Sequence, residues 1–509
     1  MAKIRRILIA NRGEIAVRIQ QTCRLLGIET VALYTRSDQN SLHVRMADRC
    51  ISVPGLESFS NPDFILDLCR ETRSDAIHPG YGFLAERADF IQACDSAGVL
   101  FIGPPADVVE MVVDKISVLE QARAAGFPTI QHSSLCYDET AIQELATEAS
   151  RIGYPVVIKS CRGGRGRGER LVLRPDQLHQ AVQRAQAESK AVYGQRKVFL
   201  ERAILPAHQI SVQILADAHG NRLHLGEREG SILLGNQKLV EESPSPALTE
   251  ALRTQIHQTA LKLAELFGLQ NAVSIEFLVD RNGAFYFTEI KARIQVDHPL
   301  TESRTRLDLV NEQIRLAQGD QLNFRQMDID LRGCAMLCRV SAEDPWTSYF
   351  PSPGVLGSVN LPVVPEVRLD TFISQGCEIS PEYDPLLVKM TAWGPDRQAC
   401  LKRTLNALAS LKIHGVPTNQ PLLQKILVDP EVAAGRYNTG MRVLSMYTRN
   451  GSQTIASPFE AEDLVTDEQL RDLAIAAAIS YLKRGAAAIP YLPERLNTGW
   501  HRQSRRLSG

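Results

Sequence analysis

The first part of the chain alternates short apolar runs with segments in which apolar residues recur at a helical period. The run IRRILIA at 4–10 predicts a buried strand, and the segment from about 14 to 26 predicts an amphipathic helix. The same alternation predicts strands at 29–35, 75–80 and 99–103 and helices near 62–72 and 86–97. Strands that alternate with helices indicate an α/β domain with a parallel, doubly wound sheet up to about residue 104.

From residue 105 to 330 the order of elements changes, which indicates a second domain. Helices are predicted near 115–125, 139–152, 176–189 and 248–267, with strands at 155–160, 170–174, 198–204 and 209–217. Residues 331–445 mix strands with a helix near 396–411 and indicate a third domain. After a linker, a capping box at Thr466–Gln469 starts a predicted helix to about Lys483, and the end of the chain is basic and polar.

Composition places the chain among average globular proteins, with 44% hydrophobic residues, 23% charged residues and a net charge of -1. The near-zero charge argues against general attraction to nucleic acid or to a membrane surface. No apolar run reaches the roughly 18 residues of a spanning helix. The ten cysteines are scattered without a CxxC pair, so we expect buried thiols, a cytoplasmic protein and no zinc site.

The segment SIEFLVDRNGAFYFTEI at 274–290 contains Asn282–Gly283 between two alternating runs, the pattern of a β-hairpin. A two-residue loop would place Glu276 opposite Glu289. Like charges across a ladder are destabilising, and a divalent cation shared by both carboxylates would compensate them. A solvated pair at a sheet edge is the alternative, but the flanking residues EFLV and FYF are apolar.

The second strand of this hairpin is predicted to run on as EIKARIQVD. An extended chain would place apolar residues on one face and charged or amide side chains on the other. The polar face would hold Glu289, Lys291, Arg293, Gln295 and Asp297. Their alignment with the carboxylate pair favours a functional site over a solvated face.

Six motifs closely resemble biotin carboxylase, and the likeness covers about residues 3–445. The motifs are IANRGEIAVRI at 9–19, HPGYGFLAE at 78–86, IGYPVVIK at 152–159, QKLVEESPSP at 237–246, RIQVDHPLTE at 293–302 and SAEDP at 341–345. The resemblance implies an α/β (α+β) chain with an ATP-grasp core. Its implied parts are a Rossmann-like N-terminal domain at 1–114, an ATP-grasp domain at 115–330 with a mobile lid at about 131–203, a C-terminal biotin carboxylase domain at 331–445, and a linker, helix and basic tail at 446–509.

The resemblance also implies an activity and its partners. Members of the family use ATP, bicarbonate and Mg²⁺ (or Mn²⁺) to carboxylate biotin on a biotin carboxyl carrier protein. They work with carboxyltransferase subunits in acetyl-CoA, propionyl-CoA and related acyl-CoA carboxylases, as in fatty acid biosynthesis, and are usually homodimers. ATP converts bicarbonate, a poor electrophile, into carboxyphosphate, which releases CO₂ beside biotin.

The matched motifs imply roles for particular residues. For ATP these are Lys115, Lys159, Glu201 and the loop glycines Gly163, Gly164 and Gly166. For the metal they are Glu276 and Glu289, and for bicarbonate Arg293, Gln295 and Val296. Lys238 and Arg339 match residues that stabilise carboxyphosphate and the biotin enolate, and Asp297 stands where the family has a glutamate general base.

Several positions depart from the family pattern. In KSCRGGRGRGER at 159–170, Arg162 and Arg165 interrupt the glycine run that presents backbone N–H groups to phosphate. The arginines would either strain the loop or add contacts to phosphate. Lys291 replaces an asparagine ligand, and a protonated lysine offers three donors and no acceptor. It would repel a cation, or neutralise Glu276 and Glu289 in place of one.

Other positions also depart from the family pattern. Leu233, Leu234, Gly235 and Asn236 replace a polar, basic run, and Gln209 and Ser211 replace a histidine and a glutamate. Asp297 is shorter than glutamate by ~1.5 Å, and misplacement on that scale can cost about 100-fold in rate.

Two functions remain open from the sequence. The first is a working biotin carboxylase subunit, weakened or altered. The second is a catalytically inactive paralogue with a structural or regulatory role, which dimerises with an active carboxylase or docks carrier and carboxyltransferase partners. The protein is expected to form a homodimer or a heterodimer with an active paralogue. A different ATP-dependent ligase is a third possibility. The tail, with its Trp500–Arg506 stretch, is either a docking element or a solvated extension.

Overall fold

The computed structural model describes residues 4–138, 141–162, 170–344, 350–441 and 443. Residues 1–448 form one compact unit, and 449–509 form a second unit that lies outside the described residues. The loop glycines Gly163, Gly164 and Gly166, Arg165 and the predicted tail helix are therefore outside the described part of the chain. In that part, every helix is too short or too polar to cross a bilayer.

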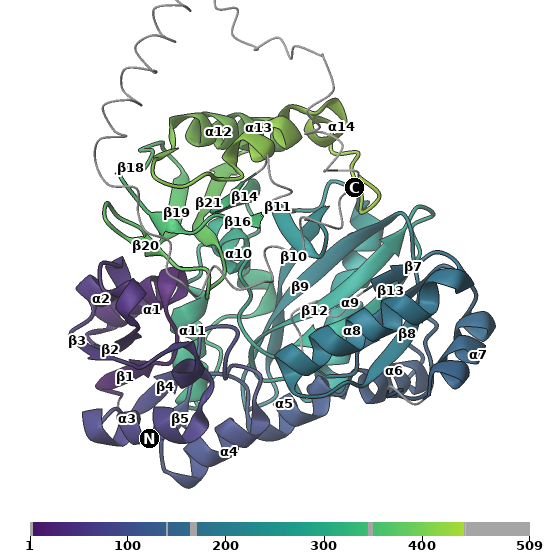
Figure 1. The fold of residues 1–509 in the computed structure, drawn as a ribbon, viewed down its shortest axis with the longest axis horizontal. Helices are drawn as coiled ribbons and strands as arrows, with labels where there is room; N and C mark the ends of the chain where they lie inside the picture. Colours follow the sequence, from purple (N-terminus) through teal and green to yellow (C-terminus); the bar gives the residue numbers. More distant parts are fainter. Residues whose placement is uncertain (1–3, 139–140, 163–169, 345–349, 442, 444–509) are drawn as a thin grey trace, which may run out of the picture. The chain divides into compact units, whose positions relative to one another are not determined.

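The N-terminal region is built on a five-stranded parallel sheet in the order β3-β2-β1-β4-β5. Its strands are β1 (Arg6–Ile9), β2 (Glu29–Tyr34), β3 (Arg49–Ser52), β4 (Ala76–His78) and β5 (Leu100–Phe101). The helices and short 3₁₀ turns between them are α1 (Gly13–Leu26), η1 (Arg36–Asp38), α2 (Leu42–Met46), η2 (Leu56–Ser60), α3 (Pro62–Thr72) and α4 (Ala88–Ser96). The predicted parallel α/β sheet is confirmed (Figure 1).

An eight-stranded antiparallel sheet forms the centre, in the order β13-β12-β9-β10-β11-β14-β21-β19. Its strands are β9 (Ala207–Ala216), β10 (Arg222–Leu234), β11 (Gln237–Ser243), β12 (Asn271–Asp280), β13 (Phe285–Lys291), β14 (Cys334–Ser341), β19 (Val367–Thr371) and β21 (Leu386–Gly394). Because β11 pairs with β14, the predicted second and third domains share this sheet. Helices α9 (Glu250–Leu266), α10 (His298–Thr305) and α11 (Leu309–Ala317) connect its strands.

The third region completes the far end of this sheet. Helices α12 (Arg397–Ser410) and α13 (Gln420–Val428) lie beside β14 and β21 (Figure 1). The remaining short elements are η4 (Gln326–Asp328), β15 (Glu343–Asp344), β16 (Phe350–Pro351), β17 (Gly354–Val355), β18 (Val359–Asn360), β20 (Glu378–Ile379), β22 (Lys412–Ile413) and α14 (Pro430–Ala433). The predicted helix near 396–411 is confirmed.

A smaller three-stranded sheet, in the order β7-β6-β8, forms a separate layer. It consists of β6 (Val156–Ser160), β7 (Arg170–Val172) and β8 (Val198–Arg202), with helices α7 (Ile142–Ile152) and α8 (Leu178–Tyr193) and the 3₁₀ turn η3 (Pro175–Gln177). These elements have their own apolar cluster, which includes Leu145, Ile158 and Val182. The layer falls within the segment predicted as a lid.

One prediction about the cysteines is wrong. Cys136 and Cys161 form a disulfide across 25 residues, with their Cα atoms 6.2 Å apart. The two residues meet because the segment before α7 pairs with β8, through Tyr137 and Val198, while Cys161 directly follows β6. No sequence motif marks this pair. The other eight cysteines are free thiols, and Cys50 is exposed.

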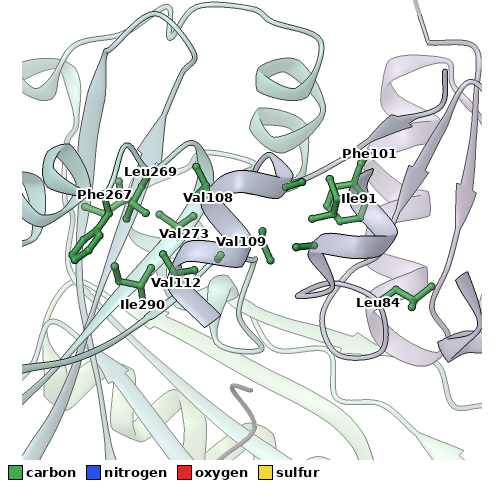
Figure 2. Packing of buried hydrophobic residues seen from close by; sticks show 14 of the residues in the cluster. Leu84, Ile91, Phe101, Val108, Val109, Val112, Phe267, Leu269, Val273 and Ile290 are labelled. Carbon is green, nitrogen blue, oxygen red and sulfur yellow. The ribbon is translucent and has the colours of Figure 1, made fainter. Parts of the chain in front are cut away.

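A continuous apolar core connects the N-terminal sheet to the central sheet. Figure 2 shows side chains of α5 (Ala106–Val113) between two groups of residues, Ile91 and Phe101 on one side and Val273 and Ile290 on the other. Helix α6 (Lys115–Ala124) follows directly, and its N-terminus is capped by Asp114, whose side chain accepts a hydrogen bond from Ser117 N–H. This packing sets Lys115 beside β13.

Candidate active site

The hairpin of β12 and β13 brings Glu276 and Glu289 face to face, as predicted. The loop differs from the expectation, because Asp280 N–H donates to the carbonyl of Ala284, which leaves three residues in the loop. Phe277 consequently pairs with Phe287, and a bulge next to this pair restores the register. The assumption of a two-residue loop was wrong. The extra loop residue shifts the strand register by one position and the bulge shifts it back, so the predicted pairing of Glu276 with Glu289 is confirmed.

Two lysine ammonium groups lie beside Glu289, one member of this carboxylate pair. Lys291 Nζ is 2.8 Å and Lys115 Nζ 3.5 Å from Oε2 of Glu289. Burial acts to raise the pKa of Glu289, but Lys291, Lys115 and Lys159 outweigh it and hold that pKa well below its usual range. Burial acts to lower the pKa of Lys291, but Glu289 and Glu276 outweigh it, so its pKa is raised and the amine is charged.

These residues do not fit a divalent ion that is shared by Glu276, Glu289 and position 291. Mg²⁺ requires a near-octahedral set of oxygen ligands. No group of three or more His, Cys, Asp or Glu side chains suited to a metal occurs in the described part of the chain. The Lys291 ammonium instead supplies the positive charge that the pair requires, which is the second of the two roles expected for it.

A second charged cluster lies on β11 and β14. Lys238 Nζ is 3.2 Å from Oε1 of Glu241 and 3.6 Å from Oδ2 of Asp297. Arg339 Nη2 is 2.6 Å from the other oxygen of Glu241. Burial raises the pKa of Glu241 despite Arg339. The structure therefore brings three predicted residues, Lys238, Asp297 and Arg339, around a buried glutamate.

Asp297 is buried at the centre of this cluster. Burial acts to raise its pKa, but Arg228 and Lys238 outweigh burial and hold the pKa far below its usual range. Its Oδ2 lies 3.2 Å from Nε of Arg228 and 3.6 Å from Nζ of Lys238. The side chain is thus ionised, and the same two cations make it a weaker base than an ordinary carboxylate.

Gln295 connects the two clusters. Its Nε2 donates to Oε1 of Glu276 at 2.7 Å, and its Oε1 accepts from Arg228 Nη2 at 2.5 Å. Arg293 lies further out, where its Nε is 3.3 Å from Oε2 of Glu86, and Val296 is half-buried.

The extended strand predicted to reach Asp297 ends at Lys291 instead. Its pairing with β12 stops at Lys291, and α10 begins at His298 with Pro299 in its first turn. Ala292 and Ile294 are buried, but so are Lys291, Gln295 and Asp297, so burial does not separate the two predicted faces. Asp297 becomes the residue that precedes α10.

Two of the residues predicted to contact ATP, Lys159 and Glu201, form a third group. Lys159 Nζ on β6 lies 2.9 Å from Oε2 of Glu201 on β8, and both side chains are largely buried. Arg162, the first arginine of the interrupted glycine run, lies 3.3 Å from Glu110. The predicted phosphate and adenine residues therefore meet across one small sheet.

The apolar departure at 233–236 is a hairpin turn. Leu234 pairs with Gln237 across Gly235–Asn236, and Gly235 has a φ of 60°. Gly230 lies on β10 next to the side chain of Lys238. A Cβ at Gly230 would lie 2.7 Å from Cε of Lys238. The absence of a side chain at 230 thus leaves room for the Lys238 stem.

Two residues of the site were missed by the sequence reasoning. Glu241 lies within the motif QKLVEESPSP, but its repeated glutamates gave no sign of which one is buried. Arg228 lies between Glu227 and Glu229 in β10, and such a charged run gave no sign that its arginine is buried.

Comparison with known families matches most of the chain. Residues 3–109 match "Biotin carboxylase, N-terminal domain", 114–325 match "Carbamoyl-phosphate synthase L chain, ATP binding domain", and 337–442 match "Biotin carboxylase C-terminal domain". The biotin carboxylase of Nostoc sp. (strain PCC 7120) is 43% identical over 441 residues, which cover 86% of this chain and 98% of that protein. The chain belongs to the biotin carboxylase family.

Other members of the biotin carboxylase family support this assignment. The biotin carboxylase of Haemophilus influenzae is 40% identical over 86% of this chain and 97% of that protein. Biotin carboxylase 1 of Bacillus subtilis is 40% identical over 88% of this chain and 100% of that protein.

Solved structures of family members confirm the ATP-grasp fold. The biotin carboxylase domain of Hydrogenobacter thermophilus 2-oxoglutarate carboxylase, solved as a dimer with MgADP, ADP and bicarbonate, has a TM-score of 0.83 and 38% identity, covering 86% of this chain and 97% of that one. A biotin carboxylase from Campylobacter jejuni has a TM-score of 0.82 and 34% identity, covering 86% of this chain and 98% of that one.

Proposed function

We propose that the chain is an active biotin carboxylase component of an acyl-CoA or 2-oxo acid carboxylase complex, with an altered nucleotide site. It would use ATP and bicarbonate to carboxylate biotin on a carrier protein. The observation that supports this proposal above others is the cluster of Lys238, Asp297 and Arg339. They place an ionised carboxylate and two cations around the buried Glu241.

Each group of the cluster suits one part of the chemistry. Asp297 stands where the family has a glutamate general base, and its carboxylate would take the proton of bicarbonate once a bound anion offsets the charges of Arg228 and Lys238, which lower its pKa. The bicarbonate oxygen then attacks the terminal phosphoryl group of ATP, giving carboxyphosphate and ADP. Lys238 and Arg339 stabilise the negative charge that develops on carboxyphosphate and on the biotin ureido oxygen. Carboxyphosphate breaks down to CO₂ and a phosphate trianion. The phosphate takes the proton from the biotin ureido nitrogen, and this nitrogen then attacks CO₂.

Binding of the substrates falls to the neighbouring groups. Arg293 offers bicarbonate a planar guanidinium, with Gln295 and the backbone at Val296 beside it. Lys115 and Lys159, with the loop at 163–166, would hold the phosphates of ATP, and Glu201 would lie at the adenine. Mg²⁺ would neutralise phosphate charge on the nucleotide. Because Lys291 neutralises Glu289, we expect the protein to hold that metal weakly.

The partners implied by this function are a biotin carboxyl carrier protein and carboxyltransferase subunits. A structure related to this chain was solved as a dimer, and we propose a homodimer or a heterodimer with a paralogue. The domain limits at about 114, 330 and 445, and a docking role for the tail at 446–509, stay predictions.

Bicarbonate-dependent ATP hydrolysis with free biotin and Mg²⁺ tests the activity. Turnover that Lys238→Ala abolishes, and that Lys262→Ala on the exposed face of α9 retains, is the expected result. If the protein neither hydrolyses ATP nor melts at a higher temperature with ATP, the proposed activity is refuted.

A second function is favoured by one observation. Residues of the predicted ATP and metal sites are paired with the protein's own charges: Lys159 with Glu201 at the ATP site, and Lys291 with Glu289 at the metal site. An inactive paralogue would have no need to break these pairs for a ligand. It would co-purify with an active biotin carboxylase and change its rate without binding ATP, which equilibrium dialysis with labelled ATP measures.

A further inference from the structure

Arg228 is a fully buried arginine of β10 that lies between the two charged clusters. Its guanidinium donates to the uncharged side chains of Ser211, Gln213, Ser274, Gln295 and Thr301. Its Nε is also 3.2 Å from Oδ2 of Asp297. Since arginine has five N–H donors in a rigid planar fork, these partners occupy the whole fork.

The contact with Gln295 fixes the orientation of its side-chain amide. Arg228 Nη2 donates to Oε1 of Gln295, so Nε2 of that amide is turned toward Glu276. An amide has an acceptor end and a donor end of nearly equal size. Without the arginine, the amide could turn over and present its oxygen where its N–H₂ group now lies.

The contact with Asp297 keeps the carboxylate of that residue ionised. The groups that face this carboxylate are Arg228 from β10, Lys238 and Glu241 from β11 and Arg339 from β14. Among the cations, Arg228 has the largest effect in lowering the pKa of Asp297. The other acceptors of Arg228 that the structure describes are uncharged, so its charge is directed at Asp297.

We propose that Arg228 is a positioning residue for carboxylation, in which one planar guanidinium holds the amide of Gln295 and the carboxylate of Asp297 in the relation that bicarbonate requires. The inference rests on the proposed function for its kinetic consequence. Arg228 contacts no reacting atom in this role and acts through two side chains that do. Lysine cannot replace it, because an ammonium group has no planar fork with which to span both partners.

Two substitutions of Arg228 separate the effect of its planar fork from the effect of its charge. Arg228→Lys keeps the charge and loses the fork, and we expect the KM for bicarbonate to rise at least tenfold while the acid limb of the pH–rate profile stays in place. Arg228→Met also loses the charge, and we expect the acid limb to move to higher pH. The matched control is Arg304→Lys, a buried arginine that contacts Ser243 and backbone carbonyls of Leu331 and Gly333. Its kinetics should stay close to those of the unaltered protein.

A third substitution keeps the test valid if the arginine variants do not fold. Ser274→Ala removes an acceptor of the same Nη2 that holds Gln295, and we expect a rise of about threefold in the KM for bicarbonate, with an unchanged kcat. An unchanged KM in Ser274→Ala and in any folded Arg228→Lys protein would overturn the inference.

Bicarbonate binding without turnover distinguishes this inference from the proposed function. Bicarbonate at a concentration that just saturates the unaltered protein should raise the melting temperature of that protein and of Arg304→Lys, and should raise that of Arg228→Lys much less. This pattern in a protein without turnover would refute the proposed activity and leave the positioning role intact. Bicarbonate that stabilises Arg228→Lys to the same extent, or that fails to stabilise the unaltered protein, would refute the positioning role.

Discussion

The ammonium group of Lys291 lies 2.8 Å from Oε2 of Glu289, on the strand that sets this glutamate opposite Glu276. A buried lysine beside two carboxylates supplies the positive charge that a shared metal ion would bring. The pairing explains how two like charges are tolerated on one face of a hairpin.

Replacement of this lysine should restore metal affinity. In Lys291→Asn the ammonium is removed and an amide oxygen becomes available as a ligand, so we expect Mg²⁺ or Mn²⁺ to bind at least tenfold more tightly. Isothermal titration with Mn²⁺ in the presence of ADP measures this affinity. Lys262→Asn on exposed α9 controls for the change in net charge, and equal affinities in the two variants would contradict the role assigned to Lys291.

A methyl group at position 230 should displace the Lys238 ammonium. The new Cβ would lie 2.7 Å from Cε and 2.8 Å from Cδ of Lys238, and the flexible lysine would move aside. We expect Gly230→Ala to lower kcat about 100-fold, as for a reacting group moved by ~1 Å, with a small change in melting temperature. Gly357→Ala, whose Cβ would stay 3.8 Å from the nearest atom, serves as control. Full activity in Gly230→Ala would show that Lys238 does not need this space.

Reduction of the Cys136–Cys161 disulfide should lower stability. A cross-link that closes a loop of this length restricts the unfolded chain by about 3 kcal/mol. We expect Cys136→Ser and the reduced protein to unfold at the same temperature, below that of the oxidised protein. Cys50→Ser, at an exposed thiol, should leave the unfolding temperature unchanged. Identical unfolding of oxidised and reduced protein would argue against a stabilising cross-link.

Glu343 should make stability fall with rising pH. Burial, with a smaller effect of Asp384, raises the pKa of Glu343 to about 7. A carboxyl group whose folded pKa lies above its unfolded value holds its proton more tightly in the folded state. Its stabilising effect is therefore complete below about pH 4.5 and is lost as the pH rises through 7.

The variant Glu343→Gln tests this sign, because it mimics the protonated acid at every pH. We expect it to melt at a higher temperature than the unaltered protein at pH 8, and the gap to close toward pH 4.5. Glu382→Gln, at an exposed carboxylate, provides the control. A gap that stays constant with pH would exclude titration of Glu343 as the cause.

The parts of the site that depend on local pairing were predictable from the sequence. The Asn282–Gly283 turn and the alternating runs around it were enough to place Glu276 opposite Glu289, although the loop has a third residue and a bulge follows. Lys291 could be placed beside them because it lies on the same strand, two residues further on. The strand was predicted to extend beyond Lys291 but ends there, because periodicity gives no sign of where the pairing with a neighbouring strand stops.

The parts that depend on tertiary pairing were not predictable. Arg228 and Gln295 are 67 residues apart in the chain, and their contact exists because β10 and the segment after β13 approach the same side of the sheet. The disulfide is a similar case, because Cys136 and Cys161 meet through strand pairings made by other residues. Family resemblance identified the residues with named roles but gave no account of the arginine that connects two of them.

The pairing of β11 with β14 places Lys238 and Arg339 on adjacent strands of a single sheet. Halves of this protein made as separate polypeptides, divided near residue 331, would each carry one of these cations and an unsatisfied strand edge. Catalytic competence would then return only on reassembly of the two pieces, so complementation between them would report directly on completion of the sheet.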